Sequence, residues 1–199
     1  MKDQGKYQPL SYFQLMEVTL RELLVEKGIL SEEEIAQEVE AMRNRGYERG
    51  SRVVAHAWLD PGFKARLLQN GTQACEELGL EIPGLKLLVV ENTNEVHNAI
   101  VCTLCSCYPR MLLGIPPDWY KSRSYRSRMV REPRQVLAEF GLVLSEKIQI
   151  RIHDSSADMR YMVLPMRPAG TETWSEERLA GLVNRDCLLG VAVPNGPKD

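Results

Sequence analysis

Three cysteines close together restrict this chain more than any other feature of its sequence. The segment VCTLCSCYP contains Cys102, Cys105 and Cys107. The other two cysteines, Cys75 and Cys187, lie far from it along the chain. Cysteines this closely spaced do not form a disulfide framework of the secreted kind, and five is an odd number. The segment therefore predicts a metal or redox site in a reducing compartment.

Three familiar kinds of site compete for these sulfurs. A structural zinc ion takes four ligands, usually as two separated pairs, so zinc would have to recruit a residue such as His97 or His153 from elsewhere. An iron–sulfur cluster also needs four thiolates, at wider spacing. A thiol redox pair of Cys102 and Cys105 would leave Cys107 without a role. None of the three accounts for the whole segment.

The Cys105-Ser106-Cys107 tripeptide allows a different metal site, in which the peptide backbone takes part. If all three thiolates approach one ion, the backbone nitrogens of Ser106 and Cys107 come within bonding reach of it. Three sulfurs and two nitrogens then leave one octahedral position open. Deprotonating two amides is costly, so the ion must be highly charged, such as trivalent cobalt or iron. Such a site can act as a Lewis acid, which predicts a catalytic centre.

Charge and hydropathy argue against two broad classes of protein. The formal net charge of -2 and the pI of about 6.0 disfavour binding of nucleic acid by overall charge, and we expect none at the local basic stretch KSRSYRSRMVREPR. No apolar run reaches the roughly 18 residues of a membrane span, and the N-terminus lacks the apolar core of a secretory signal. We therefore expect a cytoplasmic protein that does not bind a membrane.

The first part of the chain carries helical patterns. Apolar residues recur at helical spacing from Leu10 to about Lys27, and Gly28 follows as a stop signal. The sequence SEEE, beginning at Ser31, is a capping box that predicts a second helix to about Arg45.

Three shorter helices are predicted next, divided by an Asp-Pro and an Asn-Gly dipeptide. Cys75 falls on the apolar side of the last one and is expected to fill the core.

The second part mixes strands with helices. LKLLVVENT and NAIVC predict two strands, of which the second leads directly into the cysteines. A broken helical stretch follows as far as Phe140. KIQIRIHD and MRYMVLPMR predict an antiparallel pair joined by the turn SSAD, and WSEERLAGLVNRD predicts a final helix capped by Ser175. This order favours an α+β fold: a helical N-terminal arm, residues 1–84, followed by a layered α-β-β-α catalytic domain, residues 85–199.

The cysteine segment resembles a known motif. VCTLCSCYP is similar to the metal-binding motif of nitrile hydratase α subunits and of the related γ subunit of thiocyanate hydrolase. The similarity continues through VENTNEVHN, PPDWY, YRSRMVREPRQVLAEFG, DSSADMRYMVLPMRPAGT, WSEERL and RDCLLGV, over roughly residues 50–193. On these motifs the chain is identified as a member of this family, whose reaction is the hydration of a nitrile to an amide.

The resemblance implies a site built by four consecutive or nearly consecutive residues. Cys102, Cys105, Ser106 and Cys107 would hold one low-spin Co(III) ion per chain, with Fe(III) as the alternative metal. Cys105 would be oxidised to sulfinate and Cys107 to sulfenate, both of which are steps of ordinary cysteine oxidation. Cys105, Ser106 and Cys107 would be the catalytic residues, with the oxygen on Cys107 as nucleophile or base.

Residues around the motif bear on the metal and the substrate. Thr103 and Tyr108 resemble the cobalt-type proteins of the family, which favours cobalt. Arg110 and Met111 depart from the usual tryptophan and proline at positions that help to wall the substrate pocket. The arginine resembles the thiocyanate hydrolase subunit, whereas the short C-terminal tail resembles nitrile hydratase. The altered wall fits an atypical member that acts on a bulky or heteroaromatic nitrile such as toyocamycin.

The family also implies supporting residues and partners. Asp154, Arg160 and Arg167 match charged residues that support the metal site. A β-type subunit would complete the active site, and an activator protein would insert the cobalt. Two alternatives remain: hydrolysis of thiocyanate to carbonyl sulfide and ammonia, and a non-catalytic metal-binding or redox-sensing module built on the same cysteines.

Overall fold

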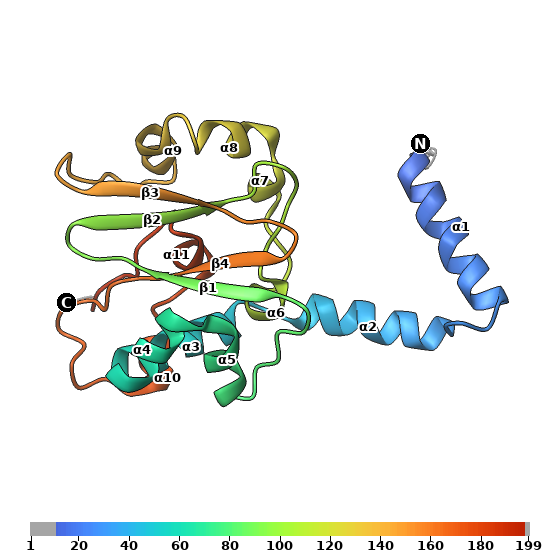
Figure 1. Ribbon diagram of the computed structural model, residues 1–199, viewed down its shortest axis with the longest axis horizontal. Helices are drawn as coiled ribbons and strands as arrows, with labels where there is room; N and C mark the ends of the chain where they lie inside the picture. The colour runs from blue at the N-terminus through green and yellow to red at the C-terminus, as the bar shows by residue number, and fades with distance from the viewer. Residues whose placement is uncertain (1–10, 198–199) are drawn as a thin grey trace, which may run out of the picture. The chain divides into compact units, whose positions relative to one another are not determined.

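A computed structural model describes residues 11–197 of the chain, apart from the side chain of Arg43 (Figure 1). In chain order its elements are α1 (Tyr12–Glu26), α2 (Glu32–Asn44), α3 (Glu48–Leu59), α4 (Pro61–Gln69), α5 (Gly71–Glu77), β1 (Lys86–Glu91), β2 (Val96–Val101), α6 (Arg110–Leu113), α7 (Asp118–Lys121), α8 (Arg123–Arg128), α9 (Pro133–Glu139), β3 (Gln149–Asp154), β4 (Met159–Leu164), α10 (Glu176–Ala180) and α11 (Arg185–Leu189). Within the described residues, no helix is long and apolar enough to cross a bilayer.

The chain divides into two compact units, of which the first ends at Met42 and the second begins at Arg43. Helices α3 to α5 share the second unit with all four strands. The division expected between residues 84 and 85 stays a prediction about which parts fold by themselves.

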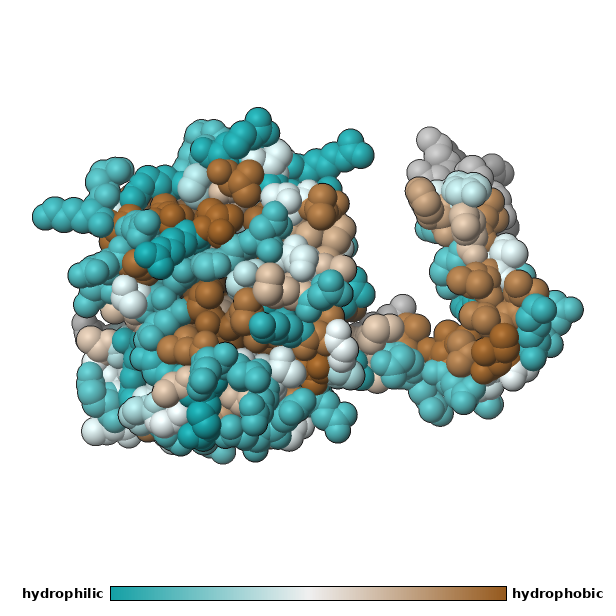
Figure 2. Space-filling model, in the orientation of Figure 1, coloured by the Kyte–Doolittle hydropathy of each residue, from teal (hydrophilic) through white to brown (hydrophobic). Residues whose placement is uncertain are grey.

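The first unit is helical, as the sequence predicts. Helix α1 begins at a capping box of Ser11 and Gln14, and α2 at the predicted box, in which Glu34 accepts from both the backbone N–H and the hydroxyl of Ser31. Leu10, the predicted start of the first helix, lies outside the described residues. No residue of α1 is buried, and brown apolar side chains show on this unit in Figure 2. The large exposed apolar residues of α1 are Tyr12, Phe13, Leu15, Met16, Leu20 and Leu23.

The second unit has strands between two groups of helices. Strands β2 and β3 form one two-stranded sheet and β1 and β4 another. In Figure 1, α7, α8 and α9 lie on one side of the strands, and α3, α4, α5 and α10 on the other. Helix α9 packs against β3, whereas α4 and α5 pack against β1. The α+β class and the layered arrangement of helices and strands are therefore confirmed.

The predicted antiparallel pairing of the last two strands is wrong. Both sheets are parallel: β3 pairs with β2, and β4 pairs with β1. Residues 155–158 therefore connect the two sheets and do not form a hairpin turn. Strands β1 and β4 carry nearly continuous apolar runs, LLVV and YMVL, which are typical of parallel strands covered on both faces.

Short polar side chains set the helix boundaries in this unit. Asp60 accepts from two backbone N–H groups at the start of α4, and Asn70 accepts from one at the start of α5. Cys75 is fully buried, as predicted. The single helix predicted from Ser175 is in fact two helices, α10 and α11, because the chain leaves the helical path after Gly181.

Candidate metal centre

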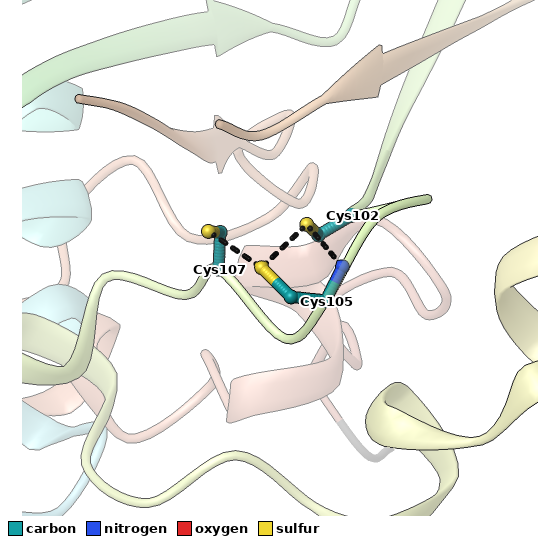
Figure 3. A group of neighbouring side chains, drawn as sticks. All are labelled: Cys102, Cys105 and Cys107. Atoms are coloured by element: carbon teal, nitrogen blue, oxygen red, sulfur yellow. Dashed lines mark hydrogen bonds between the residues drawn. The ribbon is translucent and has the colours of Figure 1, made fainter. Parts of the chain in front are cut away.

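The three clustered cysteines lie on the turn that leaves β2, as the sequence predicts. We call residues 102–107 the cysteine loop. Cys102 is fully buried, Cys105 is exposed and Cys107 is half-buried. Their sulfur atoms converge, and all three lie within 4.8 Å of one another (Figure 3). Within residues 11–197, this is the one group of three or more histidine, cysteine or acidic residues placed to hold a metal ion.

Two of the three sulfur separations are shorter than a tetrahedral site requires. The Cys105 sulfur lies 3.4 Å from that of Cys102 and 3.0 Å from that of Cys107. For a metal–sulfur bond of about 2.3 Å, neighbouring sulfurs lie about 3.3 Å apart at right angles and about 3.8 Å apart in a tetrahedron. The fourth side chain that zinc would require does not join the group among the described residues.

Backbone nitrogens of the loop face the same sulfurs. The N–H of Cys105 donates to the sulfur of Cys102 at 3.3 Å. The backbone N–H groups of Ser106 and Cys107 help to lower the pKa of the Cys105 thiol, which places them beside its sulfur. The two amides that an octahedral site would recruit therefore lie next to the cluster. This donor set of soft sulfurs and amide nitrogens fits a small trivalent ion.

The thiols of the loop differ in acidity. The Cys107 thiol lowers the pKa of Cys105 by donating to its sulfur, and the thiol of Cys102 and the loop amides lower it further. Burial raises the pKa of Cys107 to about 12, the Cys105 sulfur adds to this rise, and the positive charge of Arg160 opposes it. Of these two thiols, Cys105 therefore loses its proton the more readily.

Asp154 holds the start of the cysteine loop. The parallel register of the β2–β3 sheet places Val101 opposite Asp154, so the end of β3 lies beside the first loop residues. One carboxylate oxygen of Asp154 accepts from the backbone N–H of Thr103 at 2.9 Å, and the other accepts from its hydroxyl at 2.6 Å. The carboxylate therefore fixes both the backbone and the side chain of Thr103.

Tyr120 holds the end of the loop, and the sequence analysis did not identify it. This residue of α7 is fully buried, and its hydroxyl donates to the carbonyl oxygen of Cys107 at 2.9 Å. Burial raises the pKa of the Tyr120 phenol, so the hydroxyl keeps its proton and stays a donor. The signal available in the sequence was the motif PPDWY, which ends at this tyrosine.

The two predicted supporting arginines lie at different places. Arg160 carries its charge close to Cys107, and its guanidinium donates to the carbonyl oxygen of Ser156. Arg167 donates instead to the carbonyl oxygen of Trp58 at 3.1 Å and to both oxygens of Thr171. The structure therefore brings Arg160 to the cysteine loop, whereas Arg167 ties its own segment to α3.

Arg110 and Met111 lie two residues beyond the loop, after Tyr108 and Pro109. Arg110 is the exposed first residue of α6. Met111 is half-buried, and its sulfur accepts from the guanidinium of Arg45 at 3.4 Å.

His97 is structural, in line with the common role of such histidines. It is buried, and its Nε2 donates to the carbonyl oxygen of Gly190 at 2.8 Å while its Nδ1 accepts from the side chain of Asn92. His153 donates from Nε2 to the side-chain oxygen of Asn98 at 2.8 Å. Neither histidine joins the sulfur cluster.

Known proteins resemble this chain over most of its length. The family model described as "Nitrile hydratase, alpha chain" matches residues 11–192. The low-molecular weight cobalt-containing nitrile hydratase subunit alpha of Rhodococcus rhodochrous is 53% identical over 177 residues, which are 88% of this chain and 86% of the relative. The thiocyanate hydrolase subunit gamma of Thiobacillus thioparus is 44% identical over 197 residues, 93% of this chain and 81% of the relative.

A solved structure agrees with the fold. A double mutant of the Fe-type nitrile hydratase from Comamonas testosteroni Ni1 superposes with a TM-score of 0.87 and 44% identity, covering 96% of this chain and 94% of that one.

Proposed function

The chain belongs to the nitrile hydratase alpha-chain family, and on that premise we propose that it is the metal-carrying subunit of a cobalt nitrile hydratase, a hydro-lyase that converts a nitrile to the amide. The observation that carries this proposal is the convergence of the sulfurs of Cys102, Cys105 and Cys107 on one short loop, where the N–H of Cys105 donates to the sulfur of Cys102. A second observation is the large share of the chain that matches cobalt-containing relatives.

Cys102, Cys105 and Cys107 would hold one Co(III) ion through sulfur, and Ser106 and Cys107 would also hold it through their amide nitrogens. The short separations of the Cys105 sulfur from the other two support this assignment, as do relatives that are cobalt-containing. We propose Cys105 as sulfinate and Cys107 as sulfenate, because Cys105 is the more exposed of the two and a more accessible thiolate oxidises further. Fe(III) is the alternative metal.

The reaction adds water across the carbon–nitrogen triple bond. Bound cobalt supplies a Lewis acid that polarises this bond. As a base, the sulfenate oxygen of Cys107 would take a proton from the attacking water; as a nucleophile, it would add to the nitrile carbon, and water would then restore the oxygen on sulfur. In either role one water is consumed, and the amide gains one oxygen on carbon and two hydrogens on nitrogen. Arg160 stabilises the negative charge on Cys107. Arg110 and Met111 line the substrate side, and Arg167 supports the site from a distance.

We propose that a β-type subunit covers the cysteine loop and that an activator protein inserts the cobalt. Leu104, at the tip of the loop, is 86% exposed and Cys105 is exposed, which leaves the metal site open to solvent in the isolated chain. The exposed apolar side chains of α1 support a large partner surface as well. We place the enzyme in the cytoplasm, where the cysteines stay reduced until metal is bound.

Replacing Asp154 by alanine is expected to lower the affinity of the loop for cobalt about ten- to hundredfold, the usual effect of losing an outer supporting residue of a metal site. The variant loses both hydrogen bonds that hold Thr103. Asp154→Asn keeps one acceptor for the backbone N–H and should recover part of the affinity. Cobalt retained per chain during dialysis against a chelator measures the effect, and equal retention by all three proteins would contradict it.

Hydrolysis of thiocyanate is the second candidate function. The chain is 44% identical to a thiocyanate hydrolase gamma subunit, and Arg110 resembles that subunit at a pocket position.

The test is to co-express the chain with its β-type subunit and activator and to offer the assembled protein nitriles and thiocyanate separately. We expect about one cobalt per chain, a cysteine peptide that carries three added oxygen atoms, and conversion of nitriles to amides. Activity on thiocyanate alone would favour the second candidate. Zinc with unmodified thiols and no turnover would contradict both and support the non-catalytic module.

A further inference from the structure

A buried phenol fixes the one residue that carries two of the five proposed metal bonds. Cys107 would offer two donors, its sulfur and its amide nitrogen, so any rotation of this residue moves both together. The Tyr120 hydroxyl donates to the carbonyl oxygen of the same residue. The direction of that carbonyl is therefore tied to a side chain outside the cysteine loop.

The ring of Tyr120 is itself held in place. It has no exposed surface and belongs to an aromatic cluster, with ring centroids 5.3 Å from Tyr108, 5.9 Å from Trp119 and 5.8 Å from Tyr125. The contacts with Tyr108 and Trp119 are edge-to-face and the one with Tyr125 is tilted. Such contacts fix the orientation of the ring, so the hydroxyl is pre-positioned before any metal arrives.

The two ends of the cysteine loop are thus attached to different elements. Asp154 at the end of β3 fixes Thr103, and Tyr120 in α7 fixes Cys107. Between these attachments lie Leu104, Cys105 and Ser106, of which the first two are exposed. The loop middle receives little support from packing, so its shape depends on how its ends are held.

We propose that Tyr120 is a positioning residue of the metal site, whose hydroxyl orients Cys107 so that the sulfur and amide nitrogen of that residue face the same ion. This inference rests on the metal site proposed above. In this role Tyr120 contacts neither the metal nor the substrate. It affects only the geometry of the ligands.

The test compares Tyr120→Phe with Tyr125→Phe in the assembled cobalt enzyme. Tyr125 is the matched control, because it is also buried and its hydroxyl also donates to a backbone carbonyl, that of Ile100 within β2, at 2.6 Å. We expect Tyr120→Phe to shift the visible sulfur-to-cobalt absorption band and to lower kcat about tenfold or more, with KM nearly unchanged. Tyr125→Phe should keep the band and kcat while losing a similar amount of thermal stability.

Restoring a donor provides the rescue. With 4-aminophenylalanine at position 120, an amine can donate to the Cys107 carbonyl, and the absorption band should return toward that of the wild type. The inference is overturned if Tyr120→Phe folds with a wild-type band and kcat, or if Tyr125→Phe produces the same shift. If Tyr120→Phe does not fold, the 4-aminophenylalanine protein is compared with the wild type alone. An absorption band that stays away from the wild-type position in that protein overturns the inference as well. A wild-type enzyme without cobalt or band would instead refute the proposed function.

Discussion

Replacing Cys105 by alanine is expected to abolish cobalt binding and nitrile hydration without unfolding the chain. Cys105 lies between the other two sulfurs, at 3.4 and 3.0 Å, so its removal takes away the donor that connects them. Its side chain is exposed, so the loss should cost little stability. Outer residues of metal sites already cost about 10- to 100-fold in affinity or activity, and a direct ligand should exceed about a hundredfold.

Cys75→Ala is the matched control for Cys105→Ala. Cys75 is fully buried, and burial raises the pKa of its thiol to about 12, so it stays an apolar filler of the core. Its replacement should lower the free energy of unfolding by roughly 1–2 kcal/mol and leave the cobalt content unchanged. Metal analysis and thermal melting of both variants measure the contrast. Cobalt retained in Cys105→Ala, or lost in Cys75→Ala, would mean that the metal lies elsewhere.

The metal site was largely predictable because its ligands are close neighbours in the sequence. Sulfurs two or three residues apart on one turn can meet without help from the rest of the fold, and the amide nitrogens lie between them. The attachments of the loop were less accessible. Asp154 could be identified only by resemblance, because its contact with Thr103 depends on the register of β2 against β3. Tyr120 was visible only as the last letter of a motif.

The pairing of the strands could not be predicted from the local sequence pattern. All four strands were predicted, yet which strand pairs with which is decided by helices that cover both sheets. Leu88 pairs with Tyr161 across a long stretch of chain, whereas a turn of four residues suggested a hairpin. The apolar runs of β1 and β4 were the overlooked signal for parallel strands.

The length of β4 explains why the two predicted arginines lie apart. Arg160 lies near the start of β4 and Arg167 beyond its end. A strand of this length spans about 17–20 Å, so one residue reaches the cysteine loop and the other reaches Trp58.

Replacing Gly190 by alanine is expected to cause a large loss of stability at a position outside the metal site. Gly190 ends α11 with a φ of 77°, in the left-handed region, and a Cβ at this position would lie 2.0 Å from the carbonyl oxygen of Asn98 and 2.8 Å from the Cα of Ala99. Left-handed backbone costs an alanine about 1–2 kcal/mol, and a clash with the backbone of β2 adds about 1–3 kcal/mol or more. For a chain of this size the melting temperature should fall by roughly 10 °C.

Gly141→Ala separates the clash from the backbone strain. Gly141 has a φ of 84°, and a Cβ there would meet no atom within 4 Å. Its replacement therefore carries the left-handed cost alone, about 1–2 kcal/mol, and should lower the melting temperature by only a few degrees. Thermal unfolding of the metal-free chain measures both variants against the wild type. Equal losses at the two positions would show that β2 moves away from α11 freely, and that the His97–Gly190 contact does not hold the strand that leads into the cysteine loop.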